Sequence, residues 1–273
     1  MRLILLGVRG STPAPGAEFV RYGGHTSCVA VVPEGTDVPC LVLDAGTGLR
    51  ALTGLLAGEP YRGAIVVSHL HWDHVQGLPF FAAADRPDAE VEFYAPAQDG
   101  QSGRDLLARL MAPPVFPITP EGLKGRWSFH ALAAGTREIQ GFEVAAFEVA
   151  HKGGRTFGFR VSAGGRSFAY LPDHIIGDGV DETVRALLRD VDVLLHDAQF
   201  VESERAFADA YGHSTVQDAV GLARECGARR LVLFHHGPAR TDHALDSIRE
   251  GLAGSPWVTL AVQGEVIDID PHQ

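Results

Sequence analysis

The sequence contains few cysteines, no long hydrophobic segment and a deficit of positive charge. Its three cysteines, Cys28, Cys40 and Cys226, are scattered and not in CxxC spacing, which argues against a disulfide framework and a cysteine-based metal site. The apolar run near the start spans only four residues before Gly7, too short for the core of a signal peptide, and no window approaches membrane-spanning length. We therefore expect a cytoplasmic protein with reduced thiols and no membrane partner.

The deficit of positive charge bears on the partners that the protein can bind. The chain has 23 lysines and arginines against 34 aspartates and glutamates, a net charge of −11. Proteins that bind nucleic acid broadly need a cationic surface that displaces counterions from the phosphates. The charge balance therefore argues against nucleic acid as a partner, although it leaves room for a local basic pocket that binds a small anion.

The hydrophobic pattern predicts one α/β domain over residues 1–273. Near-continuous apolar runs such as "CLVLDAG" and "RRLVLFHH" are typical of strands buried on both faces. Short glycine turns predict antiparallel strands over roughly residues 124–171, and the proline-rich residues 112–122 predict a surface excursion. Helix-like segments lie between other strands, at residues 181–190, 214–227 and 242–254.

The segment "VVSHLHWDHVQG" crowds four candidate metal ligands, His69, His71, Asp73 and His74, into six positions after an apolar run. Side chains alternate along an extended chain, so we expect the first three to point to one side, with Asp73 at the N-cap position of a short helix. Buried imidazoles and carboxylates need polar partners. Together these donors suit zinc and neighbouring divalent metals, so the segment predicts a metal site.

Three further candidate ligands stand where apolar strands end. His151 follows "FEVAAFEVA", Asp173 follows "SFAYLP" and His235 follows "RRLVLF". The carboxyl ends of strands are where α/β sheets place their sites. His236 is adjacent to His235, and strand alternation lets only one of the two face inward. The chain thus offers enough ligands for more than one metal ion.

These motifs resemble those of the metallo-β-lactamase-fold hydrolases. The "HLHWDH" segment, "HDAQF" followed by "GHST", and a last strand that ends in histidine are similar to the tRNase Z-like and phosphodiesterase branch. The resemblance implies an αββα four-layer sandwich that binds two divalent ions. It implies one ion held by His69, His71 and His151, a second held by Asp73, His74 and His235, and Asp173 between them. Zinc is the default from ligand chemistry, and manganese or iron also suit carboxylate ligands.

The resemblance also implies three catalytic residues, Asp73, Asp197 of "HDAQF" and His213 of "GHST". A carboxylate-oriented imidazole can donate a proton to a departing alkoxide near neutral pH. The family usually has glutamate where this chain has Asp197, so the shorter side chain leaves its contact with His213 open. In this fold the counterpart of Asp44 braces the metal loop, and we expect the same here.

Together these features predict a dinuclear metal-dependent hydrolase. The favoured function is a phosphodiesterase that acts on a small or cyclic nucleotide-like, anionic phosphodiester through a metal-bridging hydroxide. An RNA-processing endonuclease of the tRNase Z type is an alternative, disfavoured by the charge of −11 and by the lack of a long basic arm. A thioester or lactone hydrolase on the same fold is another. Members of this branch are often dimers, so a homodimer is also compatible with the resemblance.

Overall fold

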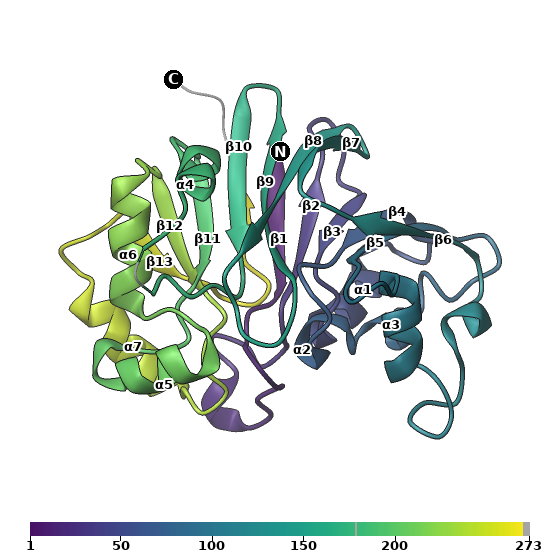
Figure 1. Ribbon diagram of the computed structural model, residues 1–273, viewed down its shortest axis with the longest axis horizontal. Helices are drawn as coiled ribbons and strands as arrows, with labels where there is room; N and C mark the ends of the chain where they lie inside the picture. Colours follow the sequence, from purple (N-terminus) through teal and green to yellow (C-terminus); the bar gives the residue numbers. More distant parts are fainter. Residues whose placement is uncertain (178, 270–273) are drawn as a thin grey trace.

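Two seven-stranded sheets form the centre of the protein (Figure 1). The computed structural model describes residues 1–177 and 179–269. The first sheet has the spatial order β14 (Val266–Asp268), β1 (Arg2–Gly7), β2 (Cys28–Val32), β3 (Leu41–Leu43), β4 (Arg62–Val66), β5 (Glu90–Pro96), β6 (Arg126–Leu132). The second has the order β13 (Val258–Leu260), β12 (Arg230–Phe234), β11 (Val193–Asp197), β10 (Arg166–Leu171), β9 (Thr156–Ala163), β8 (Phe142–Val149), β7 (Gly135–Ile139).

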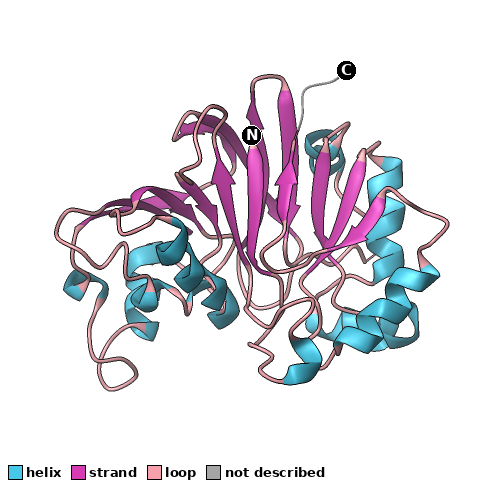
Figure 2. Cartoon of the chain, turned by 180° about the vertical axis from the view of Figure 1, so that it is seen from behind, coloured by secondary structure: helices cyan, strands magenta, loops and turns pink. Residues whose placement is uncertain are grey.

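Helices cover the outer faces of both sheets (Figures 1 and 2). The helices beside the first sheet are α1 (Leu52–Leu55), α2 (Trp72–Val75) and α3 (Gly103–Leu110). Those beside the second are α4 (Glu182–Leu188), α5 (Arg205–Tyr211), α6 (Val216–Glu225) and α7 (Asp242–Gly251). Helix, sheet, sheet and helix layers follow one another, which confirms the predicted αββα sandwich.

Three apolar layers hold this arrangement together. Val29, Leu43, Phe159 and Phe234 belong to the core between the sheets, and each is fully buried. Two further clusters fill the space between each sheet and its helices. Strand β2 is buried along its whole length, because both of its faces pack against apolar neighbours. Within residues 1–177 and 179–269, no helix is long and apolar enough to cross a membrane.

The antiparallel region is shorter than the sequence predicts. Strands β7 to β10 pair antiparallel, but β6 lies in the other sheet and pairs parallel with β5. The connection from β5 to β6 passes through α3, and a crossover of this length returns the chain in the parallel direction. The proline-rich segment 112–122 belongs to this connection, and its Phe116 and Ile118 are partly buried against the apolar cluster that also contains Leu107 of α3.

The parallel strands determine where the site lies. Strands β3, β4, β5 and β6 are parallel neighbours, as are β10, β11, β12 and β13. The carboxyl ends of parallel strands meet at one edge, so the loops after them converge there. In Figure 1 this edge lies at the bottom of the sheets, between the α1–α3 and α5–α7 groups of helices.

Candidate metal centre

The loop after β4 presents its ligands in a way that differs from the prediction. The chain leaves the extended conformation at Trp72, where α2 begins, and His71 is the N-cap. Asp73 and His74 therefore lie inside the helix, and the expectation that Asp73 occupies the N-cap on an extended segment is wrong. The helical turn still brings the two side chains together, with His74 Nε2 3.3 Å from Asp73 Oδ2.

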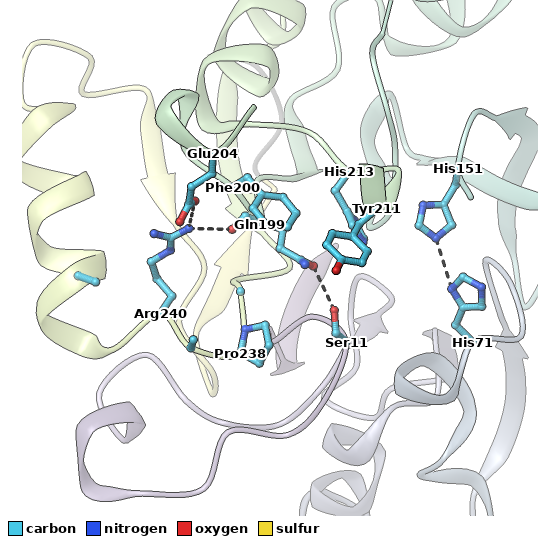
Figure 3. A pocket seen from close by; sticks show the side chains of 13 residues that line it. Ser11, His71, His151, Gln199, Phe200, Glu204, Tyr211, His213, Pro238 and Arg240 are labelled. Atoms are coloured by element: carbon cyan, nitrogen blue, oxygen red, sulfur yellow. Dashed lines mark hydrogen bonds and ion pairs between the residues drawn. The ribbon is translucent and has the colours of Figure 1, made fainter. Parts of the chain in front are cut away.

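One group of candidate ligand atoms surrounds the Oδ2 atom of Asp173. Asp173 Oδ2 lies 3.5 Å from His69 Nε2 and 3.3 Å from His151 Nε2. His71 Nδ1 lies 3.3 Å from His151 Nε2 (Figure 3). The ligand atoms of these four residues lie within 4.8 Å of one another, which is compact enough for a single ion.

A second group of candidate ligand atoms surrounds the Oδ1 atom of Asp173. Asp173 Oδ1 lies 3.0 Å from His235 Nε2 and 3.3 Å from His74 Nε2. His235 Nε2 is also 3.2 Å from Asp73 Oδ2. The structure thus brings all seven predicted ligand residues together, and Asp173 stands between the two groups. His236 points elsewhere, because its Nε2 donates to the Ala261 carbonyl at 2.8 Å.

In three of the candidate ligand histidines, the ring nitrogen that faces away from the centre, Nδ1, is hydrogen-bonded to another residue. His74 Nδ1 donates to Asp44 at 2.8 Å and His151 Nδ1 donates to the Gly212 carbonyl at 2.7 Å. His69 Nδ1 lies 3.0 Å from Ser68 Oγ, which itself donates to Asp44. A neutral histidine that donates through Nδ1 has its lone pair on Nε2, the form that binds a metal, and in all three residues Nε2 faces the centre.

Several inward atoms have only other candidate ligand atoms as polar neighbours among residues 1–177 and 179–269. His69 Nε2, His74 Nε2 and Asp173 Oδ1 are buried, and none of them forms a hydrogen bond of normal geometry with these residues. Buried polar atoms without partners are rare because each costs free energy. Imidazole nitrogen and carboxylate oxygen are donors that zinc and related divalent metals bind. The residues present therefore fit a divalent metal centre.

The electrostatics of the centre favour added positive charge. Burial lowers the pKa of His69, His71 and His151, so these imidazoles are neutral near pH 7. Burial alone would raise the pKa of Asp73 and Asp173, but their histidine neighbours outweigh it and lower both pKa values. The carboxylates in turn raise the pKa of His74 and His235, so these two imidazoles carry the compensating positive charge when no metal is bound, and a divalent metal would supply that charge in their place.

Asp44, directly after β3, hydrogen-bonds the loop after β4 and the candidate ligand His74, as the sequence predicts. It is fully buried and accepts hydrogen bonds from Ser68 N at 2.7 Å, Tyr170 Oη at 2.8 Å and His74 Nδ1 at 2.8 Å. This carboxylate therefore holds both the loop after β4 and the ring of His74.

We expect Asp44→Ala to lower the affinity for the metal by about 10- to 100-fold, because the ring of His74 loses its outer anchor. Competition with a chromophoric chelator measures this affinity. Tyr170→Phe is the matched control, since it removes one hydrogen bond to the same carboxylate and leaves His74 anchored. Unchanged affinity in a folded Asp44→Ala protein would contradict the assigned role.

Asp197 and His213 are in direct contact despite the shorter side chain. Asp197, the last residue of β11, accepts from His213 Nδ1 at 2.8 Å and from the backbone N–H of Gln199 at 3.0 Å. The His213 ring stacks on that of His235, with centroids 5.1 Å apart. Burial lowers the pKa of His213, but the Asp197 carboxylate outweighs burial and raises it. The pair therefore favours a protonated imidazole beside the centre.

Ser11 is a site residue that the sequence analysis does not identify. Its backbone N–H donates to Asp73 Oδ2 at 2.7 Å, and its φ of 63° marks a tight turn after β1. The motif "VRGSTP" signals a turn at this point, but nothing in it indicates a contact with Asp73, 62 residues further along the chain.

A cavity of about 500 Å³ opens beside the centre on the α5 side (Figure 3). His71, His151 and His213 line its wall toward the centre. The other side chains labelled in Figure 3 are Ser11, Gln199, Phe200, Glu204, Tyr211, Pro238 and Arg240. A ligand in this cavity, the α5-side cavity, can reach the imidazole of His213.

Comparison with known proteins agrees with this arrangement. The family model for the β-lactamase superfamily domain matches residues 41–236, which contain every candidate ligand. The chain belongs to the metallo-β-lactamase superfamily. It is a metal-dependent hydrolase of that superfamily, as the motifs predict.

Individual relatives place it in the tRNase Z-like branch. A ribonuclease Z from Salinibacter ruber is 28% identical, over 91% of this chain and 90% of its own length. The crystal structure of human tRNase Z, short form, has a TM-score of 0.71 at 25% identity and covers 99% of this chain and 100% of that one. A diphosphatase of the PhnP family shares the fold, with a TM-score of 0.72 at 19% identity over 98% of both chains.

These relatives overturn the prediction that nucleic acid is not a partner. That prediction used the net charge of −11, yet the proteins that are similar over nearly their whole length include a ribonuclease Z and a tRNase Z. Net charge sums over the whole surface, whereas binding depends on the charge at the site. A second cavity, on the α3 side of His71, is locally basic although the whole chain is acidic. Arg109 and Arg155 line it, and none of its described lining residues is acidic.

Proposed function

We propose that the protein is a dinuclear metal-dependent phosphodiesterase that cleaves a nucleotide-type phosphodiester. The placement of Asp173 carries the proposal, because its two oxygens face separate groups of ligands. His69, His71 and His151 would hold one ion, and Asp73, His74 and His235 the other, with Asp173 shared. Zinc is the first candidate and manganese the second.

Two such ions, when bound, lower the pKa of a water molecule and offset the charge on the phosphoryl oxygens. The chain must then supply a proton to the departing alkoxide. Because His213 donates through Nδ1 to Asp197, its Nε2 is free for this task. His213 lines the α5-side cavity, so the leaving group is placed there. Phe200 and Tyr211 line the same cavity and offer aromatic surface to a nucleoside.

Cleavage of RNA is a second candidate function. It is favoured by the similarity to ribonuclease Z over 91% of this chain. Incubation with an unprocessed tRNA and analysis of the products on a denaturing gel tests it. A single cut near the 3′ end would support this function, and an intact tRNA alongside hydrolysis of small diesters would exclude it.

Hydrolysis of bis(p-nitrophenyl) phosphate tests the phosphodiesterase proposal directly. We expect protein loaded with zinc or manganese to release p-nitrophenol and Asp73→Ala protein to release none. His130→Ala is the matched control, because this exposed histidine contacts Ser128 and stacks on Tyr94, and it is not among the candidate metal ligands. No turnover by protein that holds two metals per chain would exclude phosphodiester chemistry. Thioesters and lactones would then be the next substrates to assay.

A further inference from the structure

The cavity on the α3 side of His71, about 300 Å³ in volume, is the second recess that adjoins the centre. His71 lines both this cavity and the α5-side cavity. Its Nδ1 belongs to the candidate ligand group, whereas its Nε2 faces Gly153 on the α3 side. Gly153 has a φ of +95°, and a Cβ at this position would come within 3.0 Å of His71 Nε2. The glycine therefore keeps the edge of the imidazole open to this cavity.

The walls of the α3-side cavity combine apolar surface with two arginines. Leu70, Leu106 and Leu110 give apolar surface, and Arg109 and Arg155 give charge. Arg155 is already engaged, because its Nε and Nη2 donate to the two oxygens of Glu148 at 3.1 and 3.0 Å.

Arg109 is available to a ligand. It forms no ion pair or side-chain hydrogen bond with any residue in the ranges 1–177 and 179–269, and it is exposed near the carboxyl end of α3. Arg104 on the same helix is instead paired with Glu121. In a chain with a net charge of −11, an unpaired arginine in a cavity without carboxylates is suited to an anion.

We infer that the α3-side cavity binds the nucleotide that retains the cleaved phosphate, and that Arg109 binds a further phosphate on that nucleotide. This inference rests on the proposed phosphodiesterase function. His213 lies on the α5 side, so the leaving group occupies that side and the other substituent on phosphorus extends past His71 toward α3. The apolar wall receives the base, and the guanidinium of Arg109 receives the phosphate.

The substrate class that follows is a linear nucleotide chain. Water attacks phosphorus, the bond from phosphorus to the leaving oxygen breaks, and that oxygen takes a proton from His213. The phosphomonoester product, which carries its second phosphate, stays in the α3-side cavity. A cyclic mononucleotide has both ester oxygens on one nucleoside, so it cannot fill the cavities on both sides of His71. The inference therefore favours linear chains over cyclic mononucleotides.

Two p-nitrophenyl esters with the same leaving group test the subsite. One is the p-nitrophenyl ester of thymidine 5′-phosphate, and the other carries an additional 3′-phosphate. We expect kcat/KM to be about 10- to 100-fold higher for the ester with the additional phosphate, and Arg109→Gln to remove this preference. Arg104→Gln is the matched control on α3 and should keep it. Calorimetry with thymidine 3′,5′-bisphosphate provides a readout independent of turnover, and its Kd should rise by the same factor in Arg109→Gln protein.

The outcomes separate the subsite from the phosphodiesterase function. Hydrolysis of both esters with equal kcat/KM, and a Kd unchanged in Arg109→Gln protein, would overturn the subsite and leave the function in place. If neither ester nor bis(p-nitrophenyl) phosphate is hydrolysed, the function itself fails. Loss of bis(p-nitrophenyl) phosphate hydrolysis in Arg109→Gln protein would also contradict the inference, because that substrate carries no further phosphate.

Discussion

Asp173→Ala is expected to lower phosphodiesterase turnover by about 10³-fold or more, since metal-assisted catalysis supplies several kcal/mol of transition-state stabilisation. Asp173 has one oxygen 3.3 Å from His151 Nε2 and the other 3.0 Å from His235 Nε2. Its removal therefore weakens both candidate metal positions at once. Elemental analysis after gel filtration should show fewer than two metals per chain, and turnover should fall in parallel.

A carboxylate outside the centre provides the control for this variant. Asp246 on α7 is ion-paired with Arg21 and Arg249, and Asp246→Ala should keep both the metal content and turnover. Circular dichroism and the thermal unfolding midpoint establish that each variant is folded. Full metal content and full activity in a folded Asp173→Ala protein would contradict the shared position of this residue.

His213→Ala is expected to lower turnover by about 10²-fold or more for diesters with an alkoxide leaving group, with metal content unchanged. The imidazole is anchored by Asp197 at 2.8 Å and lines the α5-side cavity, where the proposed function places the leaving group. An alkoxide is a strong base that must be protonated as it departs, whereas p-nitrophenolate leaves readily without a proton. The loss should therefore be much smaller for p-nitrophenyl esters than for a dinucleotide.

This contrast distinguishes a proton donor from a metal ligand. His213 also lies close to Asp173 and His235, so its ligand atom could join theirs around an ion. Loss of metal, with equal damage to both classes of substrate, would assign His213 to the ligands instead. Asp197→Asn provides a second comparison, because it keeps the shape of the side chain and removes the charge that raises the pKa of His213. It should produce the same dependence on the leaving group, and it should retain its metal.

Much of the centre can be predicted from the sequence. Residues such as His151 and Asp173 stand where apolar strands end, and a polar side chain there has no role in packing. The pattern of strands also predicts that these ends share one edge, because parallel strands end together. Both features depend on local sequence, so the fold class and the candidate ligands follow without coordinates.

The backbone of the "HLHWDH" segment is harder to predict. An extended chain and a short helix both place His69, His71 and Asp73 near one another, and the sequence favours the first. The structure has the second, because the segment after His71 closes a helical turn that donates from His74 N to the His71 carbonyl. Over so few residues, the loop's tertiary contacts outweigh side-chain periodicity.

The sequence by itself determined an α/β fold, the types of candidate ligand and their positions at strand ends, because these depend on hydrophobic periodicity and on the cost of burying polar groups. The two-sheet sandwich followed only from the resemblance of the motifs to a known family. Only the tertiary structure decided that His235 and not His236 faces the centre, that Asp197 reaches His213, and that Arg109 lines the same cavity as His71 without an ion pair to residues 1–177 or 179–269. Each of these depends on distances between segments far apart in the chain. Such distances are set by how the two sheets and their loops pack, and neither local periodicity nor total charge records them.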